Sequence, residues 1–199
     1  MKIISKTLFI AACMAFASCG TTENKDSDYD NDENMSSDST TMNVETTMNS
    51  ATAVVMIESK SDSKLSGKVV FTETNGTVTL NANLSGLDKG QHAIHIHAMG
   101  DCSAHDAKSA GGHWNPTNEK HGKWGEGEFH RGDIGNITAD EDGNASLSME
   151  TDLWCLSCDD STKNIIGKSM MIHAGVDDLT SQPSGDAGSR VGCGVIELK

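Results

Sequence analysis

The sequence is poor in positive charge. It carries 15 lysines and arginines against 29 aspartates and glutamates, so its formal net charge at pH 7 is −14. Nucleic-acid-binding proteins need a basic surface, because much of their affinity comes from contacts with phosphates. Binding to an anionic membrane surface by charge makes the same demand. The sequence therefore predicts no nucleic-acid partner and no electrostatic membrane contact.

Long apolar runs and aromatic side chains are scarce as well. No stretch approaches the roughly 20 consecutive apolar residues of a membrane-spanning helix, and aromatic residues make up 4% of the chain. Glycine, by contrast, occurs 20 times among the 199 residues. A domain of about 150 residues can bury most of its apolar surface. This composition favours a single turn-rich β domain.

The first 19 residues are typical of an export signal. Two lysines precede an apolar run over 7–17, and small residues lead to Cys19. The ending FASCG resembles a bacterial lipobox, which implies lipidation of Cys19 and membrane attachment as a periplasmic or outer-membrane lipoprotein of a bacterium. An ordinary cleaved signal peptide is the alternative. Residues 20–50 are acidic with few large apolar side chains, which predicts a disordered tether; residues 51–199 are the expected domain.

Export would place the domain in an oxidising compartment, where disulfides persist. One cysteine lies inside the signal and Cys19 at the lipidation site, which leaves four: Cys102, Cys155, Cys158 and Cys193. Four cysteines allow three pairings. We favour Cys102–Cys193 and Cys155–Cys158, because the latter two are too close in sequence to close any useful loop but their own.

Short alternating runs separated by turn residues predict an all-β domain, an antiparallel barrel or sandwich. Eight strands are expected: 51–59, 64–74, 77–84, 91–98, 133–139, 144–150, 169–174 and 191–198. Asn75-Gly76 and Asp142-Gly143 supply tight turns between them. The connections over 99–132 and 175–190 are longer than ordinary loops, so we expect them to be functional.

Histidines gather in one stretch of the chain. Seven of the eight lie between residues 91 and 135, and the eighth is His173. Neutral imidazole is the commonest protein ligand for transition metals, so this clustering indicates a metal site. His95 and His97 are two apart and therefore share one face of a strand. Further candidate ligands follow in a glycine-rich loop: His113, His121, His130 and Asp133. Three histidines and a carboxylate suit zinc, whereas strand histidines suit copper.

Six segments resemble the copper-zinc superoxide dismutases. They are HIHAMGDC at 95–102, SAGGHWNP at 109–116, KHG at 120–122, HRGDIGN at 130–136, IIGKSMMIHAGVDDL at 165–179 and GDAGSRVGCGVI at 185–196. The segments follow the family's order and span nearly the whole predicted domain. The resemblance implies an eight-stranded antiparallel Greek-key barrel with two long functional loops. It also implies an enzyme that converts superoxide to dioxygen and hydrogen peroxide, with copper cycling between Cu(II) and Cu(I) and zinc ordering the site.

The same resemblance implies a role for each matched residue. The copper ligands would be His95, His97, His113 and His173. The zinc ligands would be His113, His121, His130 and Asp133. The shared His113 would also exchange a proton during catalysis, and Arg190 would attract and orient the superoxide anion. Asp177 would accept hydrogen bonds from His95 and His121, and Cys102 and Cys193 match the family disulfide.

The sequence departs from the family in three features. The segment 179–188 lacks the charged residues that guide superoxide in many animal members. Cys155 and Cys158 form an additional CxxC, which we interpret as a local disulfide. His92 and His105 lie outside the implied ligand set, and we expect both to be surface residues.

Two functions and two oligomeric states are open at this stage. A non-catalytic exported copper- or zinc-binding or metal-delivery module on the same fold is the alternative to the enzyme. We favour the enzyme because all the implied ligands and Arg190 are present. Family members include both monomers and dimers, so a homodimer is one of two expected states.

Overall fold

The computed structural model describes residues 50–199. The predicted export signal, the predicted lipidation site Cys19 and the predicted tether up to residue 49 lie outside this range. Ser50, which we assigned to the tether, is instead the first residue of a strand. In the range described, no helix is long and apolar enough to cross a membrane.

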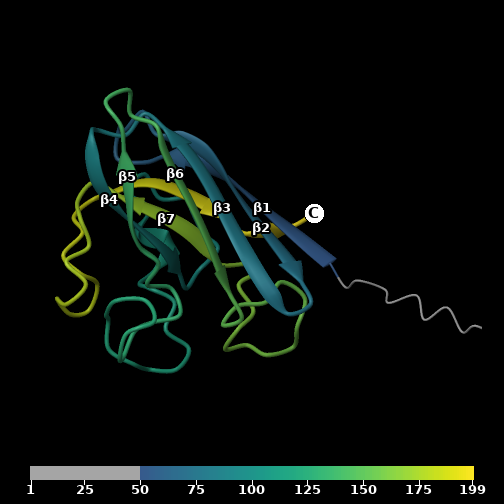
Figure 1. Ribbon diagram of the computed structural model, residues 1–199. Helices are drawn as coiled ribbons and strands as arrows, with labels where there is room; N and C mark the ends of the chain where they lie inside the picture. Colours follow the sequence, from purple (N-terminus) through teal and green to yellow (C-terminus); the bar gives the residue numbers. More distant parts are fainter. Residues whose placement is uncertain (1–49) are drawn as a thin grey trace, which may run out of the picture. The chain divides into compact units, whose positions relative to one another are not determined.

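The described chain contains nine strand segments and one short 3-10 turn at Lys108–Ala110 (Figure 1). The strands are β1 Ser50–Ser59, β2 Ser66–Thr74, β3 Thr77–Ser85, β4 Gly90–His97, β5 Gly135–Ala139, β6 Ala145–Thr151, β7 Ser169–His173, β8 Arg190–Val195 and β9 Glu197–Leu198. The order around the sheet is β2-β3-β6-β5-β4-β7-β8-β1, and β1 pairs back with β2. The sheet is therefore a closed eight-stranded antiparallel barrel, with the short β9 added on β1. The predicted fold class is confirmed.

Two crossing connections determine which strands meet at the site. β3 pairs with β6 instead of β4, and the chain returns after β6 to place β7 against the other side of β4. In this pairing His95 lies opposite Met171, and His97 lies opposite Ser169. The strand that carries two histidines thus runs beside the strand that ends at His173.

The barrel interior follows the two-residue period of its strands. On β3 the buried positions alternate with exposed ones, so that Leu80 and Leu84 point inward. β4 differs, because it is buried on both faces. Ile94 and Ile96 fill the barrel core, and burying each stabilises the fold by about 1.5–3 kcal/mol. The opposite face carries His95 and His97 and is covered by the long loops.

Our expectation for His92 was wrong, and the two-residue period explains why. We expected a surface residue, but His92 is 4% exposed, because it shares the inward face of β4 with Ile94 and Ile96. Its Nδ1 lies 3.0 Å from the carbonyl oxygen of His173, and its Nε2 lies 2.8 Å from that of Asp88. His105 is at the surface, as expected, beside Asp62.

The last predicted strand is interrupted. We expected one strand over 191–198, whereas β8 ends at Val195 and β9 begins at Glu197. The intervening Ile196 is fully buried, and its N–H donates to the carbonyl of Lys168 at 2.9 Å. Ile196 therefore leaves the ladder with β1 to bond the connection before β7.

Candidate metal centre

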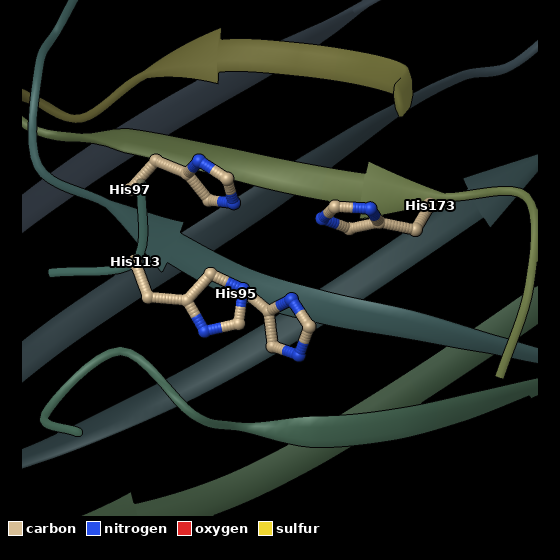
Figure 2. A group of neighbouring side chains, drawn as sticks. All are labelled: His95, His97, His113 and His173. Atoms are coloured by element: carbon tan, nitrogen blue, oxygen red, sulfur yellow. The ribbon is translucent and has the colours of Figure 1, made fainter. Parts of the chain in front are cut away.

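Four histidines converge beside the ends of β4 and β7. His95 and His97 come from β4, His173 ends β7, and His113 comes from the loop after β4. One ligand atom from each residue lies within 4.8 Å of all the others, and Figure 2 shows the rings gathered around one space. Ligands on opposite sides of an ion bound at about 2 Å would lie about 4 Å apart. The cluster is thus close to the size of a metal site.

A second cluster adjoins the first through His113. Its members are His113, His121, His130 and Asp133, again with ligand atoms within 4.8 Å of one another. Nδ1 of His113 lies 2.7 Å from the Asp133 carboxylate. Nδ1 of His121 and Nδ1 of His130 lie 3.0 and 3.1 Å from the same carboxylate. The structure therefore brings together all seven residues proposed as ligands, and His113 belongs to both groups.

Asp133 lies outside the strand in which we placed it, because β5 begins at Gly135. Its carboxylate accepts hydrogen bonds from the backbone N–H groups of His130 at 2.8 Å and Gly122 at 3.1 Å. These bonds fold the loop around the carboxylate before the ladder with β4 begins. The loop, and not the strand, holds this side chain toward His113.

In five of the six histidines, one ring nitrogen contacts a group outside the clusters, and this contact holds the ring. The contacts are His95 Nε2 to Asp177 at 2.8 Å, His97 Nδ1 to the Gly111 carbonyl at 2.9 Å, His121 Nε2 to Asp177 at 2.9 Å, His130 Nε2 to the Glu119 carbonyl at 3.1 Å and His173 Nδ1 to the Gly188 carbonyl at 3.3 Å. Such contacts orient the ring and select its tautomer.

The second nitrogen of each of these rings faces a cluster. One buried ring nitrogen on each of the six histidines has no aligned hydrogen bond: Nδ1 of His95, His121 and His130, and Nε2 of His97, His113 and His173. Buried polar atoms in proteins are nearly always hydrogen-bonded. Six exceptions directed at two neighbouring points fit a pair of bound cations. His113 turns Nε2 toward the first point and Nδ1 toward the second.

Burial lowers the pKa of histidines in the first cluster, whereas neighbouring carboxylates raise that of His121 in the second. In the first, burial lowers the pKa of His97 to about 2, that of His173 to about 3 and that of His113 to about 4, with neighbouring histidines adding to the effect. These rings are neutral at pH 7, which is the form that binds metals. In the second, burial lowers the pKa of His121, but the neighbouring Asp133 and Asp177 carboxylates outweigh burial and raise it to about 9.

The two carboxylates stay ionised although they are buried. Burial acts to raise the pKa of Asp133, but the close ring nitrogens of His113, His121 and His130, together with the His130 backbone N–H, outweigh burial and hold the pKa far below its usual range. Burial acts in the same direction on Asp177, and hydrogen bonds from His121 and His95 again lower its pKa. Asp177 thus joins one histidine of each cluster through a permanent negative charge.

Arg190, the first residue of β8, borders a cleft of about 450 Å³ that is also lined by His97, His113 and His173. Its Nη1 donates to the carbonyl of Ala107 and its Nη2 to that of Gly111, both at 2.7 Å. These bonds hold the guanidinium beside the first cluster, where it can attract and orient a small anion.

Disulfides join Cys102 to Cys193 and Cys155 to Cys158. The first ties the loop after β4 to β8, which also carries Arg190. Gly185 lets the second long loop approach the clusters. Its φ is +72°, and a Cβ there would run into the Asp177 carboxylate and the His121 ring.

Asn136 has a role at the site that its place in the sequence does not indicate. Its side-chain oxygen accepts from the Asp177 N–H at 2.8 Å, and its Nδ2 donates to the Asp177 carbonyl at 2.9 Å. These two bonds fix the backbone that presents the Asp177 carboxylate. Asn136 stands in the segment HRGDIGN, but its partner is 41 residues away, so no local pattern indicates the contact.

A comparison with known protein families agrees with this geometry. The sequence model of the family described as copper/zinc superoxide dismutase (SODC) matches residues 65–196. The match covers both histidine clusters, Asp177, Arg190 and the disulfide partners Cys102 and Cys193. The chain therefore belongs to the copper/zinc superoxide dismutase family.

Proposed function

We propose that this protein is a superoxide dismutase that uses copper and zinc. The first cluster would hold copper through His95, His97, His113 and His173, and the second would hold zinc through His113, His121, His130 and Asp133. The proposal is carried above all by His113, which is shared by both clusters and turns one ring nitrogen toward each. An imidazole that offers one nitrogen to each of two cations couples the two metals. A site for zinc alone would need only one of these nitrogens.

Bound copper would supply the one-electron redox chemistry of the reaction, and bound zinc would supply a fixed positive charge that orders the loop. In total, two superoxide anions and two protons become one dioxygen and one hydrogen peroxide. Arg190 would hold each anion at the cleft beside the first cluster. Because Asp133 engages Nδ1 of His113, Nε2 is the atom at which this ring would hold a proton and release it toward the cleft.

Arg190 and the bound copper would carry most of the attraction for substrate. The loop segment 179–188, which lies near the cleft through Pro183 and Ser184, contains no lysine or arginine. The net charge of −14 acts against the approach of an anion. The guanidinium and the metal cations are therefore the positive charges that the substrate would meet at the end of its path.

The two disulfides and the family indicate an extracellular or periplasmic protein, since disulfides persist in oxidising compartments. We propose in addition that it is a bacterial lipoprotein, attached to a membrane through acylated Cys19. Mass spectrometry of membrane-extracted protein should show an acylated N-terminal Cys19. An unmodified soluble form would reject this part of the proposal.

The enzyme and the metal-delivery module can be separated by measuring superoxide removal. We would load the protein with copper and zinc and compare it with a His173→Ala variant, which removes one proposed copper ligand. His105→Ala is the matched control, because His105 is a surface histidine of the same region outside both clusters.

The loaded wild-type protein and the control should remove superoxide at equal rates, and His173→Ala should lose the activity. A wild-type protein that binds both metals but is no faster than His173→Ala would contradict the enzyme proposal. That outcome would favour the copper- or zinc-binding or delivery module.

A further inference from the structure

We propose that Gln182 is a positioning residue for the second metal cluster. Its Oε1 accepts a hydrogen bond from the backbone N–H of His121 at 2.9 Å. Its Nε2 donates to the carbonyl of His121 at 2.8 Å and to the carbonyl of Thr180 at 3.1 Å. The side-chain amide thus pairs with both backbone groups of one residue, as a neighbouring strand would.

His121 depends on this contact for its backbone bonds. Among residues 50–199, no backbone-to-backbone hydrogen bond involves the N–H or the carbonyl of His121. The glutamine comes from the other long loop, 61 residues further along the chain. Gln182 therefore joins the two long loops at the residue whose ring enters the cluster.

The contact matters because it fixes one end of the His121 side chain. Asp177 fixes the other end by accepting from Nε2 at 2.9 Å. With the backbone and the far ring nitrogen both held, the position of Nδ1, the nitrogen that faces Asp133, is determined. If Gln182 were lost, the backbone of His121 could shift and carry Nδ1 away from the cluster.

Asn136 holds the backbone of Asp177, the partner of the His121 ring, in the same way. Its amide pairs with the N–H and carbonyl of Asp177 at 2.8 and 2.9 Å. Two side-chain amides therefore hold the backbones of Asp177 and His121, whose side chains then meet each other. Asn136 stands on β5, whereas Gln182 is exposed in a loop. Substitution of Gln182 can therefore test positioning without disturbing the core.

This inference rests on the proposed zinc role of the second cluster, so its test measures metal binding at that cluster directly. Gln182→Met keeps the side-chain length but removes all three hydrogen bonds. Gln182→Glu keeps an acceptor for the His121 N–H but sets a second oxygen against the carbonyls of His121 and Thr180. Ser181→Ala is the matched control, because the Ser181 hydroxyl contacts Asp178 in the same loop.

The full-length protein, loaded with copper and zinc, would be mixed with a chelator that changes colour on binding zinc. Loss of a residue that orients a ligand typically weakens metal binding by about 10- to 100-fold. Because Gln182 is exposed, we expect the lower end of that range: both Gln182 variants should release zinc roughly tenfold faster. Cobalt(II) placed in the zinc site should show altered visible bands in both variants. Ser181→Ala should match the wild type in both measurements.

Wild-type release rates and cobalt spectra in both Gln182 variants would overturn the inference, as would equal acceleration by Ser181→Ala. A different failure would count against the proposed function instead. If the wild-type protein took up no zinc that the chelator later removes, the second cluster would not be a zinc site.

Discussion

The two disulfides should contribute very unequally to stability. Cys102 and Cys193 are 91 residues apart, whereas Cys155 and Cys158 are three apart. In the chain-entropy account, a cross-link stabilises the fold by restricting the unfolded chain. A closed loop of roughly 90 residues contributes about 4.6 kcal/mol at 25 °C, and a loop of roughly four residues contributes about 2 kcal/mol. Loss of Cys102–Cys193 should therefore cost about 2.6 kcal/mol more.

The surroundings of the two disulfides also predict that Cys102–Cys193 matters more. Cys193 is fully buried and packs with Ala107, Ala110 and Met171. The loop that Cys102 anchors also carries the Ala107 and Gly111 carbonyls that hold Arg190. Breaking this disulfide should therefore displace the guanidinium and reduce activity as well as stability.

The second disulfide lies in a loop that has other support. The N–H of Cys155 donates to the Lys163 carbonyl at 2.9 Å, and the Ile165 N–H donates to the Cys155 carbonyl at 3.1 Å. The indole of Trp154 also donates to the carbonyl of Arg131 at 2.8 Å. These bonds do not need the cross-link, so its removal should leave the loop and the activity largely intact.

The assay compares two double variants, Cys102→Ala/Cys193→Ala and Cys155→Ala/Cys158→Ala. Urea unfolding of the metal-free proteins, followed by tryptophan fluorescence, gives the loss of unfolding free energy for each. Superoxide removal by the metal-loaded proteins gives the loss of activity. Equal losses of free energy would refute the loop-length argument. Full activity in the first variant would refute the link between this disulfide and Arg190.

Two further predictions concern pH and Gly185. In the metal-free protein, burial lowers the pKa of His113 to about 4, so its stabilising effect is present above the ordinary histidine pKa of 6.5 and is lost as the pH falls toward 4. The pKa of His121 is raised to about 9 because Asp133 and Asp177 outweigh its burial, so its effect is present below 6.5 and is lost as the pH rises through 9. Urea unfolding should therefore show maximal stability near pH 6.5, and a steady rise up to pH 9 would contradict this. Gly185→Ala should lower the unfolding temperature and weaken zinc retention more than Gly125→Ala, because both glycines have φ above +70° but only at Gly185 would the new Cβ meet Asp177 and His121. Equal effects of the two substitutions would count against the close approach.

Much of the barrel could be predicted because strand formation depends on neighbours in sequence. The two-residue period placed His95 and His97 on one face of β4, although we did not apply it to His92, and the Asn75-Gly76 turn indicated the hairpin between β2 and β3. The ends of strands were less predictable. Ile196 leaves its ladder for Lys168, and Asp133 is held by a loop; both choices depend on residues outside the local pattern.

For the site, the sequence by itself determined the chemistry: six histidines and an aspartate at the spacings of a known family, with His95 and His97 on one face of a strand. Their roles as copper and zinc ligands stay predictions. Only the tertiary structure decided what holds them. Asn136 on Asp177, Gln182 on His121 and Arg190 on Gly111 are contacts across 41, 61 and 79 residues. Such contacts leave no periodic trace in the sequence, because they exist only once the closed barrel has brought its two long loops together.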